Sequence, residues 1–177
     1  MLPLGLIYPL LLAHGGALSA FEATLAAQDS ATAALGQWCG ARHLADPATI
    51  TAAQVKGLDT MPPPDLDETL KLAEDQEPAY RHVRLSCGGK VLSEAHNWYA
   101  RQRLTPAMNQ TLDTTDTPFG KVAAPLGFTR ERLGAVRGAA PGCPRDTVLS
   151  HRALLRLPDG SPLALVVECY TPAVLRK

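Results

Sequence analysis

The chain has 177 residues, the length of a single domain with a sizeable hydrophobic core. Its 17 basic and 17 acidic residues balance to a net charge near zero, which argues against a nucleic-acid partner attracted by bulk charge. Aromatic residues are few, and Gly and Pro are frequent, as in a turn-rich α+β chain. The cysteines lack C-x-x-C spacing and the histidines lack H-x-x-x-H spacing, so we expect no metal site.

Residues 1–20 have the pattern of an export signal. Leu2–Ala13 is apolar apart from Tyr8, and the small residues that end at Ala20 fit the A-x-A cleavage pattern. The stretch is too short for a transmembrane helix, and no Cys follows the cleavage site, so we expect no stable membrane anchor. We predict a signal peptide over 1–20 and one domain over 21–177, exported to the periplasm or secreted. Because no Lys or Arg precedes the apolar stretch, a buried N-terminal helix in a cytoplasmic protein is the alternative.

Export would place the chain where disulfides persist. Cys39 and Cys87 are the first candidate pair, with Cys143 and Cys169 the remaining cysteines. Four cysteines allow three pairings, and the sequence alone does not choose among them.

The remaining chain alternates helical and extended patterns. Segment 21–44 is predicted to be helical, with an interruption where Asp29-Ser30 can cap a second helix. Further helical segments are predicted at 65–74, after a run of prolines, and after the Thr105-Pro106 cap. A short helical turn is predicted to start at Thr117. The extended segments are 48–55, 81–99, 128–137 and 148–170.

The segment 81–99 reads as a hairpin. Gly88-Gly89 suits a two-residue turn, because such turns need positive φ at their central positions. This pairing places Arg81 opposite His96, on the face that also carries Val83 and Leu85. A guanidinium on an apolar face is costly unless it has a partner or a ligand. The hairpin therefore contains the first candidate site residues.

The segment 148–170 reads as a second hairpin, turning at Asp159-Gly160. Its second arm is almost wholly apolar, so we expect a central strand buried on both faces. Within that strand, Glu168 pairs with His151. A buried carboxylate needs a partner. The purely structural explanation for Glu168 is an internal salt bridge to Arg81, Arg152 or Arg156.

Combined in one antiparallel sheet, the two hairpins would bring Arg81, His96, His151 and Glu168 to one pocket. An arginine holds a carboxylate in a bidentate fork. A glutamate beside it orients a hydroxyl or moves a proton. We therefore expect a pocket for a small carboxylate-bearing ligand.

From Ala23 to its end, the chain resembles the chorismate pyruvate-lyase family, whose fold is shared with the ligand-binding domains of some transcription regulators. Four segments carry the resemblance: Asp29-Ser30-Ala31-Thr32, the hairpin starting at Arg81, Thr117-Pro118-Phe119-Gly120, and Glu168. The resemblance implies an α+β fold with an antiparallel sheet of about six strands and helices packed on one side.

The resemblance also implies an activity. Members of this family split chorismate into 4-hydroxybenzoate and pyruvate without a metal or another cofactor. Carried over, Glu168 and Arg81 would be catalytic. The substrate-binding residues would be Arg81, His96, Phe119 and Ala31, to which the pairing with Glu168 adds His151. We expect a small aromatic carboxylate as ligand, no nucleic acid, and a monomer.

Two departures from the family leave other readings open. His96 stands at the position of a second arginine, and it cannot make the same fork. Chorismate is a cytoplasmic metabolite, so an exported lyase would lack its substrate. The first alternative is an exported, non-catalytic binding protein for a small aromatic or anionic ligand. The second is a structural domain in which these residues form an internal ion-pair network.

Overall fold

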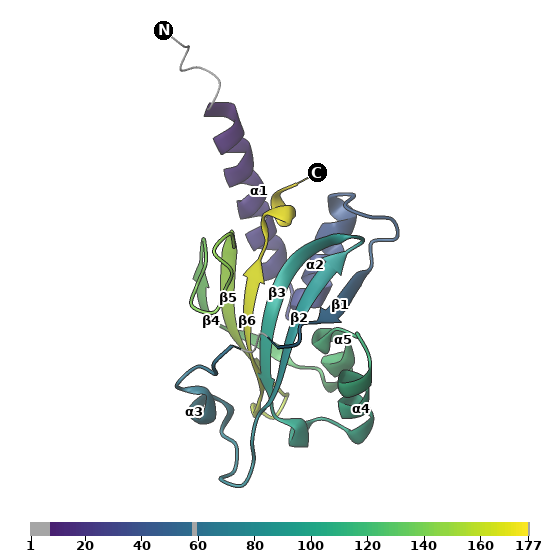
Figure 1. Cartoon of the computed structure of the whole chain (residues 1–177), viewed down its shortest axis with the longest axis vertical. Coiled ribbons are helices and arrows are strands. Elements are labelled where there is room, and N and C mark those ends of the chain that lie inside the picture. Colours follow the sequence, from purple (N-terminus) through teal and green to yellow (C-terminus); the bar gives the residue numbers. More distant parts are fainter. Residues whose placement is uncertain (1–7, 58–59, 177) are drawn as a thin grey trace.

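The computed structural model describes residues 8–57 and 60–176, and for residues 8–14 the backbone alone. The helices are α1 (Tyr8–Ala26), α2 (Ala31–Ala41), α3 (Leu66–Leu70), α4 (Pro106–Thr114) and α5 (Phe119–Ala123). The strands are β1 (Ile50–Gln54), β2 (Ala79–Cys87), β3 (Lys90–Tyr99), β4 (Thr129–Val136), β5 (Leu149–Arg156) and β6 (Pro162–Tyr170). All six form one antiparallel sheet in the order β1-β2-β3-β6-β5-β4 (Figure 1). The predicted α+β class and strand number are confirmed.

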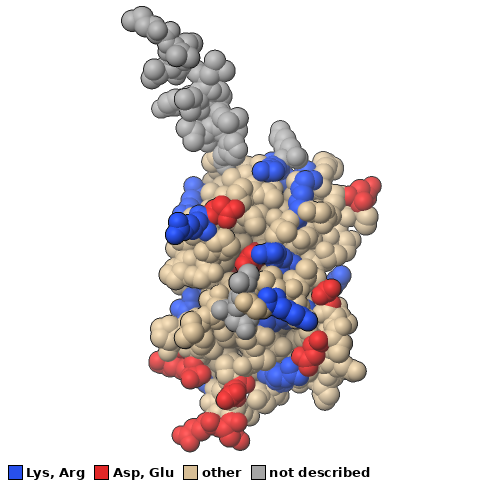
Figure 2. Space-filling view, in the orientation of Figure 1, with Lys and Arg blue, Asp and Glu red and all other residues tan. Residues whose placement is uncertain are grey.

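The helices divide the sheet into two faces. The inner face is covered by α1, α2, α4 and α5, whose apolar side chains pack on alternate residues of the strands. Among the described helices, the short α3 lies on the outer face, where Leu66 and Leu70 pack against Trp98 and Leu165. This small outer layer is the exception to the expectation that the helices lie on one side. Charged groups of both signs are scattered over the face seen in Figure 2, as the balanced composition leads one to expect.

The helix starts follow the predicted caps. The Ser30 hydroxyl accepts a hydrogen bond from the Ala33 N–H at 3.3 Å and begins α2. The Thr105 hydroxyl accepts from the Met108 N–H at 3.2 Å, with proline at the first position of α4. Both caps therefore fix where the inner-face helices begin.

The first hairpin does not have the predicted register. Leu85 pairs with Ser93 and Ser86 pairs with Val91, so β3 bulges by one residue there. Beyond the bulge, His82 is the partner of His96, and Arg81 is the partner of Asn97. The predicted Arg81–His96 pair is wrong. Because side chains alternate along a strand, the one-residue shift moves His96 to the outer face while Arg81 stays on the inner face.

The second hairpin has the predicted register. His151 pairs with Glu168, and every residue of β6 is buried. The prediction of a central strand buried on both faces is confirmed.

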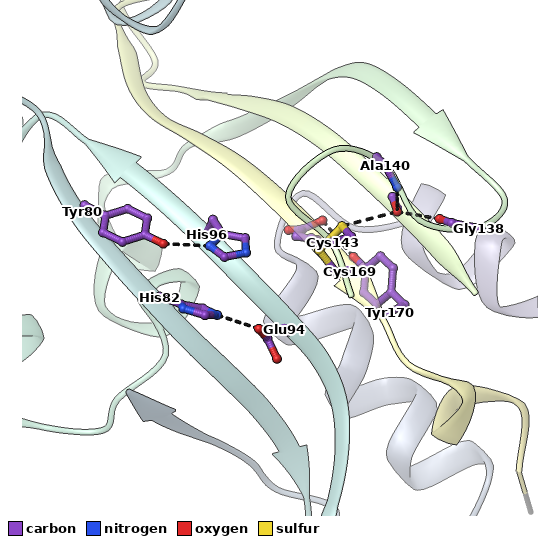
Figure 3. Close-up of a disulfide and its surroundings, with 11 residues drawn as sticks. Tyr80, His82, Glu94, His96, Gly138, Ala140, Cys143, Cys169 and Tyr170 are labelled. Carbon is purple, nitrogen blue, oxygen red and sulfur yellow. Dashed lines mark hydrogen bonds and ion pairs between the residues drawn. A yellow bond between two sulfur atoms is a disulfide. The ribbon is translucent and has the colours of Figure 1, made fainter. Parts of the chain in front are cut away.

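Two disulfides tie the layers to the sheet. Cys39 in α2 is joined to Cys87 at the end of β2, the pair that the sequence analysis favoured. Cys143, in the loop between β4 and β5, is joined to Cys169 in β6 (Figure 3). Each bridge therefore connects a strand to a segment packed over it.

Helix α1 is continuous across the predicted cleavage point at Ala20. From Phe21 onward it belongs to the core: the Phe21 ring packs at 5.2 Å from the Trp38 ring and 5.0 Å from the Tyr170 ring, between centroids. Its earlier turns extend beyond the sheet (Figure 1). The first seven residues of the predicted signal lie outside the described residues. Within the described part of the chain, no helix combines the length and hydrophobicity that a membrane crossing needs.

Candidate functional site

A cavity of about 40 Å³ lies on the inner face, between the sheet and the first turns of α2 and α5. This volume has room for a few water molecules. Its walls combine apolar side chains with polar and charged groups: Asp29, Ser30, Ala31, Thr32, Val83, Leu85, Ala95, Asn97, Phe119, Gly120, Phe128, Arg130, Leu155, Val166 and Glu168.

A buried ion pair forms one wall of this cavity. Arg130 Nη1 donates to Glu168 Oε1 at 3.1 Å, and Arg130 Nη2 donates to Glu168 Oε2. The two side chains are 4% and 6% exposed. Burial opposes the charged guanidinium, but the Glu168 carboxylate outweighs it and raises the pKa of Arg130. Arg130 is therefore a permanently charged, fork-shaped donor inside the fold.

The Tyr170 hydroxyl completes the environment of Glu168, donating to Oε2 at 2.8 Å. Burial and the neighbouring carboxylate raise the pKa of Tyr170 well above its usual value, so the phenol stays protonated. The carboxylate thus accepts three hydrogen bonds, two from Arg130 and one from Tyr170. The His151 ring lies edge-on to the Tyr170 ring, with centroids 5.6 Å apart. Burial lowers the pKa of His151, which favours its neutral form beside this charged pair.

Arg81 has a different role from the predicted one. Its Nη1 donates to the Thr117 carbonyl at 2.7 Å, and its Nη2 donates to the Thr115 carbonyl at 3.0 Å. The side chain is buried, and burial lowers the pKa of the guanidinium. Arg81 therefore fixes the loop that leads into α5 and does not line the cavity.

The cavity is closed where α5 meets α2. A Cβ atom added at Gly120 would lie 2.6 Å from the Ser30 Oγ and 3.1 Å from the Thr32 Oγ1. Glycine is therefore needed at position 120, because any side chain would collide with the capped start of α2.

The structure brings together three of the predicted site residues at the cavity: Glu168, Phe119 and Ala31. Arg81 and His151 lie on the same face of the sheet but do not line the cavity. His96 lies on the opposite face. The expected pocket shared by Arg81, His96, His151 and Glu168 is therefore not formed: Glu168 lines the inner cavity, whereas His96 and His151 both line a cavity over the outer face.

Arg130 and Asn97 are the cavity residues that the sequence reasoning missed. The salt-bridge partner of Glu168 is Arg130, not one of the three arginines considered. The alternating pattern of 128–137 predicted a strand there, as found, but gave no reason to prefer this arginine. Asn97 came to the cavity through the shifted register.

A second cavity, of about 750 Å³, lies over the outer face. It is mainly apolar and is bounded by the proline run 62–64, Trp98, Val136 and Gly142, with His96 and Arg152 in its walls. Arg152 Nη2 donates to Asp65 Oδ1 at 2.7 Å. This outer cavity is larger than the inner one, but the described residues that line it form no buried ion pair.

The fold is shared with the effector domains of bacterial regulators. PhnF from Mycobacterium smegmatis superposes with a TM-score of 0.55 at 13% identity, over 82% of this chain and 65% of PhnF, slightly under two thirds of that protein. The effector domain of PhnF alone gives a TM-score of 0.51 at 12% identity, over 75% of this chain and 88% of that domain. The C-terminal domain of the histidine utilization repressor from Pseudomonas syringae gives 0.50 at 12% identity, over 72% of this chain and 95% of that domain. The resemblance is thus supported at the level of the fold.

The sequence identifies a family as well. The chain is 39% identical to the uncharacterized protein y4mC of Sinorhizobium fredii (strain NBRC 101917 / NGR234), over 89% of this chain and 75% of that protein. The chain belongs to the same family as y4mC. No protein-family model matches the chain.

Proposed function

We propose that the chain is a small-molecule-binding protein that takes an anionic, carboxylate-bearing ligand at the inner cavity. The observation that carries this proposal is the Arg130–Glu168 fork in the cavity wall. An arginine fork that already holds one carboxylate in a buried site has the geometry to hold another. Ser30, Thr32 and Asn97 add neutral hydrogen-bonding groups around it. The fold similarity to effector domains is consistent with ligand binding.

Ligand entry requires the cavity to expand. A cavity of about 40 Å³ is far smaller than typical ligand pockets of roughly 300–1,000 Å³. The contact between Gly120 and Ser30 is the place to open, because α5 is short and rests on the capped end of α2. The ligand carboxylate would then share the Arg130 guanidinium with Glu168, which keeps its hydrogen bond from Tyr170.

Binding is tested by calorimetry with 4-hydroxybenzoate, benzoate and inorganic phosphate as probes. We expect a carboxylate to bind to the wild-type chain and Arg130→Gln to weaken it at least tenfold. The matched control is Arg156→Gln, which removes a partly exposed arginine of β5 that is bound to Glu131 of β4. Loss of binding in Trp98→Leu but not in Arg130→Gln would place the ligand in the outer cavity and refute the inner site.

Export is the location that we propose for this function. Two disulfides suit an oxidising compartment. Phe21, directly after the predicted cleavage point, is fully buried, so removal of residues 1–20 would keep it and, among the described residues, cost the core only the partly buried Leu18. N-terminal sequencing of the protein from its native host tests this: a mature chain starting at Phe21 supports export, and an intact N-terminus in the cytoplasm contradicts it.

Pyruvate elimination from chorismate is the second candidate function. It is favoured by the presence of Glu168, Phe119 and Ala31 at one cavity, as the resemblance implies. It is weakened because Arg81 is committed to backbone carbonyls and His96 lies on the other face. The test is 4-hydroxybenzoate release from chorismate. Release that Glu168→Ala abolishes in a folded variant supports a lyase, and the absence of release from the folded wild-type chain eliminates it.

A further inference from the structure

Three side chains that can ligate a metal meet on the outer face of the first hairpin (Figure 3). His82 in β2 is the cross-strand partner of His96 in β3, and Glu94 precedes His96 by two residues on the same face. His82 and His96 are almost fully buried, and Glu94 is partly buried. The backbone ladder of two adjacent strands therefore fixes all three positions.

The spacing of the three groups suits a single ion. One ligand atom from each residue lies within 4.8 Å of the other two. His82 Nε2 and Glu94 Oε1 are 2.8 Å apart, and the rings of His82 and His96 have centroids 4.3 Å apart. Small side-chain rotations would bring these atoms to the distances of roughly 2.0–2.2 Å from a central ion that zinc requires.

Neighbouring residues orient two of the three ligands. The Tyr80 hydroxyl hydrogen-bonds to His96 Nδ1 at 2.8 Å and accepts from the Thr60 N–H at 3.1 Å. Arg84 Nε donates to Glu94 Oε2 at 3.0 Å, which leaves Oε1 facing His82. Hydrogen bonds of this kind to the distal atoms of ligands are a regular feature of protein metal sites.

His96 Nε2 is the atom that a purely structural role leaves unexplained. It is buried, and its one polar neighbour among the described residues, the Gly142 backbone, does not reach full hydrogen-bond geometry. Buried polar atoms normally have a partner, since an unsatisfied one is costly. A His82–Glu94–Arg84 ion-pair network would leave Nε2 with only the poorly aligned Gly142 contact, whereas a metal ion beside Glu94 and His82 would satisfy it.

We propose that His82, Glu94 and His96 form a binding site for a divalent transition-metal ion of the zinc type. Two imidazoles and one carboxylate are a ligand set that zinc accepts while a further position stays open. His96 lines the outer cavity, which gives solvent and small molecules access to that position. The metal site and the inner cavity lie on opposite faces of the sheet. The test of metal binding is therefore independent of the test of the proposed function.

The test is calorimetric titration of tag-free, chelator-treated full-length protein with Zn²⁺, alongside the visible absorption of bound Co²⁺. The cysteines are all in disulfides and cannot contribute thiolate ligands. We expect one equivalent of metal to bind and to raise the melting temperature. Glu94→Gln and His96→Gln should each weaken binding at least tenfold.

The matched control is His43→Gln, which removes a histidine outside the cluster and should leave binding unchanged. Tyr80→Phe tests the positioning role, with an expected loss of roughly 10–100-fold in affinity and an altered cobalt spectrum. Glu94→Gln is nearly isosteric, so it keeps the test decisive if His96→Gln does not fold. No binding by the wild-type chain, or binding that survives in folded Glu94→Gln, overturns the proposal.

Discussion

Arg130 and Glu168 meet across an intervening strand: Arg130 belongs to β4, Glu168 to β6, and β5 lies between them. The pair is buried beneath the helices, so a charge that lost its partner would be poorly solvated there. It therefore couples the edge of the sheet to its centre, and it gives the inner cavity its one fixed positive charge among the residues that line it.

Removing one member of this pair should be strongly destabilising. We expect Arg130→Ala to lower the free energy of unfolding by about 3–5 kcal/mol, because Glu168 would remain buried without its main partner. Arg156→Ala, at the exposed pair with Glu131, should cost about 0–1 kcal/mol. Denaturant unfolding with intact disulfides measures both. The double variant Arg130→Met/Glu168→Leu should lose less unfolding free energy than the sum of the losses in Arg130→Met and Glu168→Leu. A loss equal to that sum would contradict a coupled pair.

Replacing Arg81 should release the loop before α5. We expect Arg81→Gln to cost about 1.5–3 kcal/mol, since a buried, charged donor to two backbone carbonyls is lost. Amide hydrogen exchange in α5 should become faster. Arg81→Lys should not restore protection, because an ammonium lacks the fork that spans Thr115 and Thr117. Arg101→Gln, which breaks an exposed pair with Asp113, is the control. Unchanged exchange in Arg81→Gln would refute the loop-holding role.

Gly120→Ala should disturb the start of α2. The new Cβ would force the Ser30 hydroxyl away from its position and weaken a cap worth about 1 kcal/mol. It should also narrow the inner cavity and weaken any ligand there. Gly36→Ala is the matched control, because its Cβ would lie 3.8 Å from the Ile50 Cγ1, an ordinary contact. That control should be neutral or stabilising by roughly 0.5–1 kcal/mol. Thermal unfolding of the two variants compares them directly.

His96 should make the fold sensitive to acid. Burial, with a smaller contribution from His82, lowers the pKa of His96 from 6.5 to about 4. Between these values the unfolded chain binds a proton that the folded chain does not, so stability falls as pH decreases from about 6.5 to 4. The loss approaches ~3 kcal/mol at the lower end. Unfolding measured with a chelator present, in wild type and His96→Gln, isolates this contribution, and identical pH profiles would rule it out.

The two disulfides should contribute unequally. The bridge Cys39–Cys87 spans 48 residues and Cys143–Cys169 spans 26. On loop-closure entropy, removing the first should cost about 4 kcal/mol and the second about 3.5 kcal/mol. Paired Cys→Ala variants, one pair at a time, measure these values against each other. A free thiol detected in the oxidised wild-type protein would contradict the pairing.

The sequence was sufficient for the elements and for one hairpin. The caps at Ser30 and Thr105 gave the helix starts, and the Asp159-Gly160 turn gave the pairing of His151 with Glu168. These features depend on residues close together in the chain, where turn and cap chemistry decide the conformation.

The candidate site was less accessible to sequence reasoning. The bulge in β3 has no marker in the sequence, since Leu92 is an ordinary strand residue that packs in the core. Without the bulge, the predicted register was wrong by one residue: it paired Arg81 with His96, whereas the structure pairs His82 with His96. The partner of Glu168 was equally hidden, because Arg130 comes from a strand that is adjacent neither in sequence nor in the sheet.

The irregular edge strand β4 is a poor template for pairing with a second copy of the chain. Between Arg132 and Gly134 the pairing with β5 shifts by one residue, and Leu133 is the extra residue there. An incoming strand would meet an interrupted row of amide groups beside the charged Glu131, which disfavours extension of the sheet in register. Deletion of Leu133 would straighten the strand and present a continuous row of backbone amide groups. This single residue therefore disfavours edge-to-edge pairing of two chains.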